Sequence, residues 1–245
     1  MSSVSTQRET PDIETSSDDY ARRFAGPAGK YFLSIQEQAF QRVLPECPDC
    51  SVLEVGGGHG QLVPVFLRRN CELTILGSDE STHRRVRTAF PDAAIDYAVG
   101  DVLKLPYEDN SFDIVVAVRL ISHIDAWEIL LKEFCRVARH SVLIDYPSWI
   151  SLNALTPVFF SMKKGLEGNT RTYKSFFSWK ISSVLRQHEF EVSCSWNQFI
   201  LPMFLHRALH GARWLQVAER IFRAVGLTGL LGSPVVMRAD RVSRR

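Results

Sequence analysis

Several classes of protein are excluded by what this sequence lacks. None of its apolar runs reaches the ~18 residues that a membrane span needs, and its amino terminus has neither the basic start nor the apolar core of a signal peptide. A net charge of only +2 gives no basic excess that would favour nucleic acid as a partner. Cysteines are few and odd in number, five in 245 residues, which suits a reducing compartment. We therefore expect a cytoplasmic protein that binds no nucleic acid.

Clusters of metal ligands are missing as well. Cys47-Pro48-Asp49-Cys50 has the C-x-x-C spacing of redox and zinc sites, but it leads into a strand and no second ligand pair follows. We interpret it as a loop with two thiols and predict no metal site. What remains is an ordinary globular composition, 45% hydrophobic and 23% charged, long enough for one α/β domain with a sizeable core.

The stretch from Ser51 to Leu62 carries the first positive signal. Ser51 to Val55 is the apolar run of a strand buried on both faces, and four glycines then occupy five positions, Gly56-Gly57-Gly58-His59-Gly60. Glycine lets the backbone turn tightly and approach a ligand closely, because no Cβ is in the way. A helix predicted from about Gln61 to Arg69 adds free N–H groups and a positive dipole end. The combination predicts a nucleotide-type site at the carboxyl edge of a parallel sheet.

The glycine spacing distinguishes two kinds of nucleotide site. The dinucleotide pattern G-x-G-x-x-G/A, counted from Gly56 and Gly58, requires glycine or alanine where Gln61 stands. An acid two positions before G-x-G-x-G does fit, as Glu54, Gly56, Gly58 and Gly60. This arrangement resembles motif I of the class I S-adenosylmethionine-dependent methyltransferases, in particular the small-molecule, methyltransferase type 11-like group. The resemblance implies S-adenosyl-L-methionine as cofactor and these four residues as part of its site.

A second buried strand, Leu73 to Asp79, ends in an acid. Asp79 lies 19 positions after Gly60, close to the spacing of an acid that binds ribose hydroxyls. Asp79-Glu80-Ser81 is similar to the D-x-S of the same family, which favours Asp79 over its neighbour Glu80 as the ribose ligand. The alternative for Asp79 is structural, an N-cap of the helix predicted from about Thr82 to Phe90.

The most specific resemblance begins at Gly100-Asp101. The run from there to Asp113 resembles the GDxxxLPFxDxSFD segment of small-molecule methyltransferases. In that family the acid at Asp101 accepts a hydrogen bond from the adenine amino group, and the backbone N–H of Val102 meets the ring. The alternative is that Asp101 only caps a loop.

Arg119-Leu120-Ile121-Ser122-His123 follows the predicted fourth strand, Ile114 to Val118. The resemblance places this stretch, including Arg119, beside the sulfonium of the cofactor. His123 is a candidate general base, since an ordinary pKa near 6.5 suits removal of a proton from the acceptor. The alternative is a histidine that caps or packs at the entrance of the next helix. No Asn/Asp-Pro-Pro-aromatic tetrad stands here, which argues against an enzyme that methylates amino groups of nucleic acids.

Strand and helix patterns alternate along most of the chain, which demands a parallel sheet with right-handed crossovers. We predict a doubly wound, Rossmann-like α/β fold with a seven-stranded, mostly parallel sheet. Residues 1–18, poor in apolar residues, are expected to be a disordered tail, and 19–245 a single methyltransferase domain. Helical insertions on the substrate side are expected after the fifth strand, at 147–172, and between the sixth and seventh strands, at 199–231.

The insertion at 199–231 bears on the acceptor. Its apolar residues, from Leu201 to Val225, recur at three and four as one helical stripe, and the other face is basic with Glu219 as its only acid. Such a stripe commonly packs on its own domain as a structural cover. A basic amphipathic helix can also lie on an anionic membrane or close over a hydrophobic ligand. The second interpretation implies a hydrophobic acceptor and peripheral membrane contact through 199–231.

Together the motifs predict methyl transfer from S-adenosyl-L-methionine to a small-molecule acceptor, with O- or C-methylation favoured. The activated methyl group belongs to the cofactor, so the protein mainly aligns the reactants and excludes water. Two alternatives stay open. One is a non-catalytic nucleotide-binding subunit with the same fold; the other is an NAD-dependent oxidoreductase, which Gln61 and the Gly100-Asp101 segment disfavour.

Overall fold

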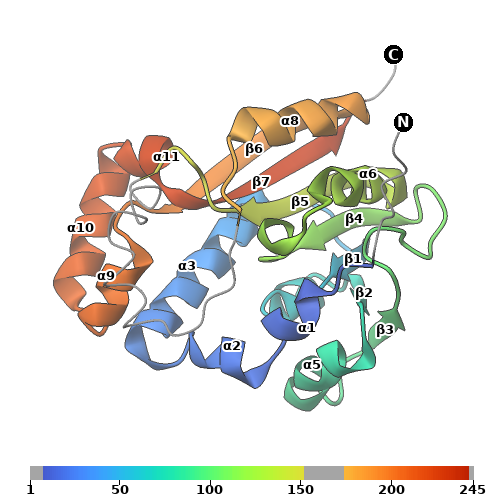
Figure 1. The fold of residues 1–245 in the computed structure, drawn as a ribbon, viewed down its shortest axis with the longest axis horizontal. Coiled ribbons are helices and arrows are strands. Elements are labelled where there is room, and N and C mark those ends of the chain that lie inside the picture. The colour runs from blue at the N-terminus through green and yellow to red at the C-terminus, as the bar shows by residue number, and fades with distance from the viewer. Residues whose placement is uncertain (1–7, 152–173, 243–245) are drawn as a thin grey trace.

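The computed structural model describes residues 8–151 and 174–242, arranged around one seven-stranded sheet (Figure 1). The strand order is β3-β2-β1-β4-β5-β7-β6, and every neighbouring pair is parallel except those that involve β7. The strands are β1 Ser51–Val55, β2 Glu72–Gly77, β3 Ile95–Val99, β4 Phe112–Ala117, β5 Ala138–Tyr146, β6 Phe190–Phe199 and β7 Ser233–Arg241. The predicted doubly wound, mostly parallel sheet is confirmed.

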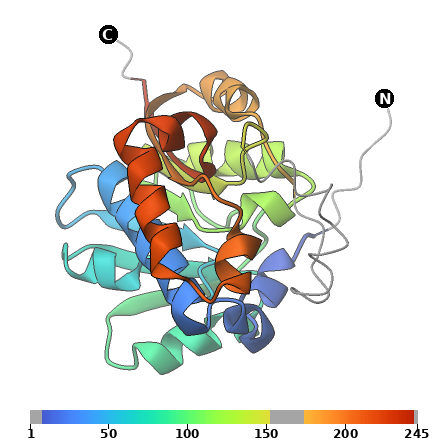
Figure 2. The ribbon, with the colours of Figure 1, turned by 90° about the vertical axis from the view of Figure 1, so that its left-hand side faces the viewer.

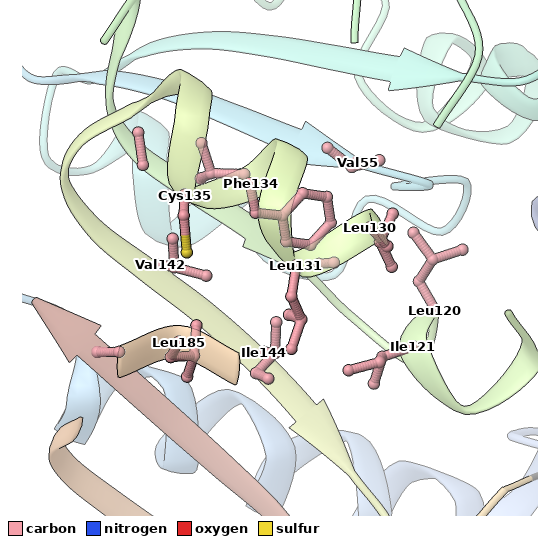
Figure 3. Close-up of a cluster of buried hydrophobic side chains, with 14 of the residues drawn as sticks. Val55, Leu120, Ile121, Leu130, Leu131, Phe134, Cys135, Val142, Ile144 and Leu185 are labelled. Atoms are coloured by element: carbon pink, nitrogen blue, oxygen red, sulfur yellow. The ribbon is translucent and has the colours of Figure 1, made fainter. Parts of the chain in front are cut away.

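The central strands are apolar throughout because both faces of the sheet are covered. Successive side chains point to opposite faces, so Leu53 and Val55 join one core while Val52 joins the other. Figure 3 shows the first core, where Phe134 and Leu130 of α6 (Trp127–Val137) pack over the sheet beside Leu185 of α8 (Ser178–Gln187). The opposite face is covered by α3 (Gly26–Val43), α4 (Val63–Leu67) and α5 (Arg84–Ala89). Short 3₁₀ turns, η1 (Glu80–His83) and η2 (Ile121–His123), follow β2 and β4.

Three short helices connect β6 to β7: α9 (Met203–Ala208), α10 (Arg213–Ala224) and α11 (Leu227–Leu231). This corrects the expected single helical stripe, because Gly211 and Gly226 adopt φ values of +70° and +80° and break the helix twice. In Figure 2 the orange-red helix α10 lies at the front of the molecule. The other expected insertion, 147–172, lies outside the described residues from 152 onward. Within the described ranges, no helix has the length and apolar character needed to cross a bilayer.

The amino-terminal residues 8–18 are ordered, which corrects the expected disordered tail over this range. They form α1 (Pro11–Thr15) and lead into α2 (Asp18–Arg22), where the side chain of Ser17 caps the helix by accepting from the N–H of Tyr20 at 3.2 Å. Asp12 and Thr15 are buried although the segment is poor in apolar residues. Figure 1 places α1 at the edge of the sheet where β1 and β2 end, so burial there comes from polar contacts with that edge.

Candidate cofactor site

The glycine turn lies where β1 ends. Gly56 and Gly60 have φ values of +73° and +60°, which a residue with a Cβ rarely adopts. The N–H of Gly56 donates to the carbonyl of Leu76 at 2.8 Å, so the turn is held against the end of β2. A cavity opens over it, lined by Thr15, Tyr20, Glu54, Gly56, Gly57, Gly58, His59, Gly60, Gln61, Val118 and Arg119. The structure thus brings together the four motif I residues and Arg119.

Glu54 lies in this cavity with an exposed fraction of only 1%. Burial raises the pKa of its carboxyl to about 8, and the positive charge of Arg119 acts in the opposite direction. Oε2 of Glu54 and Nη1 of Arg119 are both buried with no hydrogen-bond partner among the residues that the structure describes. Buried polar atoms are nearly always paired. One acceptor and one donor left open in the same cavity therefore suit a ligand that carries both an ammonium and a carboxylate.

Arg119 is held by groups that the sequence patterns did not single out. Its backbone has φ of +56°, and its N–H donates to the carboxylate of Asp145, at the end of β5. The other oxygen of Asp145 accepts from Nε2 of Gln36 on α3 at 2.9 Å. The guanidinium of Arg119 stacks over the ring of Phe24, with 4.2 Å between Cζ and the ring centroid. An acid at the carboxyl end of a buried strand was the available signal for Asp145.

His59 is another cavity residue that the patterns missed, although it stands between two motif glycines. Burial lowers its pKa to about 4, so the ring is neutral at physiological pH. Its Nε2 contacts the carbonyl of Thr15, and the ring lies 5.6 Å from that of Tyr20. His59 therefore ties the glycine turn to α1 and α2 and is not a charged ligand.

Asp79 and Glu80 follow β2 but do not line the cavity. The carboxylate of Asp79 is exposed and accepts from the N–H of Ser81 at 2.9 Å; hydrogen bonds from Ser81 lower its pKa. This is the N-cap that was the structural alternative. Glu80 is exposed and pairs with Arg87 at 2.6 Å, which draws it toward α5. Of the two acids, Asp79 is the nearer to the strand, two residues after Gly77 at the end of β2.

Asp101 and Val102 lie after β3, the next strand along the sheet edge. Oδ1 of Asp101 accepts from the N–H of Leu103 at 2.9 Å, which is the loop cap given as the alternative to adenine binding, and Val102 is fully buried. The N–H of Gly100 donates to the carbonyl of Gly77 at 3.0 Å, so the ends of β2 and β3 are adjacent. Because the strands are parallel, Asp79 and Asp101 share the carboxyl edge with the glycine turn.

His123 ends η2 and is half-buried. Its N–H donates to the carbonyl of Leu120 at 2.9 Å, and the neighbouring Ser122 accepts from the N–H of Lys174 at 2.8 Å. It is not among the residues that line the cavity over the glycine turn. His123 therefore follows β4 at the end of η2, outside the set of residues that line the cavity with Glu54 and Arg119.

The first described residues cross this whole edge. Asp12, fully buried, accepts from the N–H and Oγ of Ser78, each at 2.6 Å. Arg8 donates to the carbonyl of Gly100 at 3.1 Å. Glu9 accepts from the N–H of Ala126 at 2.8 Å, just before α6. These contacts run from the end of β2 to the end of β3 and to the start of α6.

Comparison with known proteins adds to this geometry. Residues 53–144 match the model of a family described as a methyltransferase domain. A probable S-adenosylmethionine-dependent methyltransferase of Mycobacterium tuberculosis is 28% identical over 114 residues, 46% of this chain and 41% of the relative. A ubiquinone/menaquinone biosynthesis C-methyltransferase of Dinoroseobacter shibae is 33% identical over 94 residues, 36% of this chain and 38% of the relative. The alignments thus span less than half the length of these relatives.

Solved structures extend the likeness of the fold. Magnesium protoporphyrin IX methyltransferase of Synechocystis, solved with bound S-adenosylhomocysteine, superposes with a TM-score of 0.65 at 13% identity, covering 95% of this chain and 97% of that one. The sheet order and the glycine turn are those of a class I methyltransferase fold. The match of residues 53–144 to the methyltransferase domain model confirms the resemblance predicted from the motifs.

The residues present fit one end of S-adenosylmethionine well. The open oxygen of Glu54 and the open nitrogen of Arg119 suit the ammonium and carboxylate of its methionine part. At the adenosine end the edge offers the carboxylates of Asp79 and Asp101, but Arg8 and Asp12 lie across it.

Proposed function

We propose that this protein transfers the methyl group of S-adenosylmethionine to a small-molecule acceptor. The observation that carries the proposal is the open pair in the glycine-turn cavity, Oε2 of Glu54 and Nη1 of Arg119. Glu54 would hold the ammonium and Arg119 the carboxylate of the cofactor. Asp79 would bind the ribose, while Asp101 and the N–H of Val102 would read the adenine. When bound, the cofactor supplies an activated methyl group on a good leaving group.

The protein's own contribution is alignment and exclusion of water. Asp145 and Gln36 fix the backbone of Arg119, and the rings of Phe24 and Tyr20 shield its guanidinium. We propose His123 as the group that removes a proton where the acceptor is a hydroxyl or an acidic carbon, which favours O- or C-methylation. This requires the acceptor to lie between the cavity and η2.

A hydrophobic acceptor is favoured by an exposed apolar surface on α10. Four exposed apolar side chains lie one helical turn apart, three on α10 and one at its C-cap: Trp214 61%, Val217 50%, Ile221 56% and, at the C-cap, Val225 63%. One relative is named as a ubiquinone/menaquinone biosynthesis C-methyltransferase, and one similar structure is a magnesium protoporphyrin IX methyltransferase. We propose that α10 and α11 make peripheral contact with a membrane from which such an acceptor is drawn.

The exposed charges of α10 favour contact with an anionic membrane. Arg213 and Arg220 are exposed on α10, whereas Glu219, the only acid in 199–231, is 3% exposed. Glu219 accepts from the N–H groups of Ile200 and Leu201 at 3.0 and 2.8 Å, so its charge is turned inward. An exposed apolar row with cations beside it is what an amphipathic interfacial helix presents to anionic lipid.

Ligand-induced melting and labelled methyl transfer test the function. S-adenosylhomocysteine should raise the melting temperature and NAD should not, because binding to the folded state stabilises it. A screen of acceptors with labelled S-adenosylmethionine should then transfer label to a low-polarity compound. Binding without turnover on any acceptor would favour the non-catalytic nucleotide-binding subunit. A melting shift with NAD alone would overturn the proposal.

A further inference from the structure

The amino-terminal segment Arg8 to Ser16, termed the strap, follows the same path as the proposed cofactor site. Its first residue, Arg8, donates to the carbonyl of Gly100 after β3, and Asp12 takes both donors of Ser78 after β2. At its other end Thr15 contacts His59 of the glycine turn. The strap therefore covers the methyltransferase site from the adenosine end to the methionine end.

The strap lies directly on the glycine turn, with no layer between them. A Cβ added to Gly58 would overlap the Oγ of Ser16, and one added to Gly56 would lie 3.5 Å from the Cβ of Asp12. The space that Gly58 leaves for close approach of a ligand is therefore occupied by Ser16 of the protein's own chain. Ser16 Oγ is itself buried with no hydrogen-bond partner among the described residues, so Ser16 fits the turn by shape, while the adjacent Thr15 contacts His59 through its carbonyl.

We propose that the strap is an intramolecular competitor of the cofactor, and that cofactor binding requires its release. The inference rests on the proposed function, because it assigns a regulator to that same site. Asp12 is the main anchor: its side chain is fully buried, and among the described residues its carboxylate accepts hydrogen bonds from the N–H and Oγ of Ser78. Release returns that carboxylate to water at little cost, since ionised groups are well solvated there.

The attachment of the strap suits such an exchange. Asp18, the first residue of α2, pairs with Arg84 at 3.1 Å and also contacts Arg85, so the chain is anchored to the domain immediately after the strap. Ser17, at φ −70° and ψ 159°, is extended backbone between the two short helices. The strap can therefore detach as a unit while α2 and α3 stay in place. A released segment that remains tethered can also close again after product leaves.

Competition has a quantitative consequence. A ligand that binds only the released state has an apparent dissociation constant equal to its intrinsic constant divided by the released fraction. A substitution that weakens the contacts between the strap and the domain should therefore tighten cofactor binding, although the substituted residue itself lies over the site. Asp12→Ala removes the hydrogen bonds from the N–H and Oγ of Ser78, and Arg8→Ala removes the contacts with the carbonyls of Ser78 and Gly100. Asp19→Ala is the matched control, because Asp19 is an exposed acid of the same region that pairs only with nearby Arg22 among the described residues.

The experiment measures S-adenosylhomocysteine binding to the full chain by calorimetry, together with hydrogen exchange of amides 9–17. Asp12→Ala should bind roughly 10-fold more tightly and Arg8→Ala several-fold more tightly than the unchanged chain, with Asp19→Ala unaltered. Adding the ligand to the unchanged chain should speed exchange in 9–17. Thermal melting checks that each variant is folded.

Opposite signs would overturn the proposal. Weaker binding by Asp12→Ala, with slower exchange in 9–17 on ligand addition, would mean that the strap closes over the ligand and contributes to its site. Absence of S-adenosylhomocysteine binding in the chain and in all three variants would overturn the proposed function together with the strap. Measurable binding that is weaker in Asp12→Ala would overturn only the proposal that the strap competes with the cofactor, so the two failures are distinguishable.

Discussion

Gln36 on α3 donates from Nε2 to Oδ2 of Asp145 at 2.9 Å, across 109 residues of sequence. Both side chains are buried, with exposed fractions of 6% and 2%. Burial raises the pKa of Asp145, and its hydrogen bonds from Gln36 and from the N–H of Arg119 oppose that rise. One contact thus joins a helix on the face of the sheet to the carboxyl end of β5 and, through it, to the cavity.

We expect Gln36→Leu to destabilise the fold by about 1–3 kcal/mol, because a buried carboxylate oxygen loses its donor. Gln38→Leu is the matched control, the same change on the same helix at an exposed position. Urea unfolding of both variants measures the free energies. Equal stability of the two variants would show that the bond contributes nothing net.

The raised pKa of Glu54 predicts a pH-dependent stability. In the folded chain this pKa is about 8, against an ordinary value of 4.5, so between these values the folded state holds a proton that the unfolded state has lost. Stability therefore falls as pH rises through this window. Glu54→Gln has no such proton to lose. Its free energy of unfolding should therefore rise relative to that of the unchanged chain by about 1–3 kcal/mol between pH 5 and pH 8. The exposed change Glu72→Gln should show no gain, and a pH-independent difference for Glu54→Gln would contradict the assignment.

Asp79→Ala tests the proposed ribose contact. Loss of charge-assisted hydrogen bonds to two hydroxyls should weaken S-adenosylhomocysteine binding roughly 10- to 100-fold. Since the carboxylate also caps η1, melting must be measured beside affinity to separate the two effects. Asp79→Asn keeps the cap and should still bind weakly, while Asp92→Ala, an exposed acid elsewhere, should not. Full affinity in Asp79→Asn would leave Asp79 as a cap only.

His123→Ala tests the proposed base. We expect kcat to fall by about 10²- to 10⁴-fold, the usual contribution of a general base, with little change in cofactor affinity. The exposed His140, 64% exposed at its side chain, provides the control His140→Ala. An unchanged kcat between pH 6 and pH 9 would end the assignment. A parallel loss of cofactor affinity would instead indicate that His123 only positions η2.

The sequence predicted the sheet well because its signals are local. A buried strand, a glycine turn and an acid at a strand end each follow from a few adjacent residues, as at Val52 to Gly60 and at Gly100-Asp101. The helix breaks at Gly211 and Gly226 were also local, but their apolar neighbours continued the period and concealed them. A glycine within a stretch of helical periodicity should therefore be taken as a helix break, even where the apolar pattern continues past it.

What the sequence did not predict depends on contacts between distant residues. No periodic apolar pattern around Asp12 indicates that it is buried. Its carboxylate bonds instead to Ser78, 66 residues away in the sequence. The side chain of Asp145 is held by a hydrogen bond from Gln36, and the ring of His59 contacts the carbonyl of Thr15. Composition alone therefore suggested a disordered tail where polar contacts order the segment from residue 8 onward. Such polar pairings carry no periodicity, so tertiary structure is needed to find them.

The exposed face of α10 yields the last prediction. The protein should float with vesicles that contain anionic lipid at low salt, and less so at high salt, because exposed arginines attract the surface. Trp214→Ser with Ile221→Ser should weaken this association at least roughly 10-fold by removing apolar area from the interface. Arg213→Gln with Arg220→Gln should weaken it by about 1 kcal/mol per residue and reduce its salt dependence. Trp179→Ser on α8 is the control, since Trp179 is 64% exposed on a different element. Flotation that is independent of lipid charge, or lost equally in the control, would leave α10 as a cover of the domain.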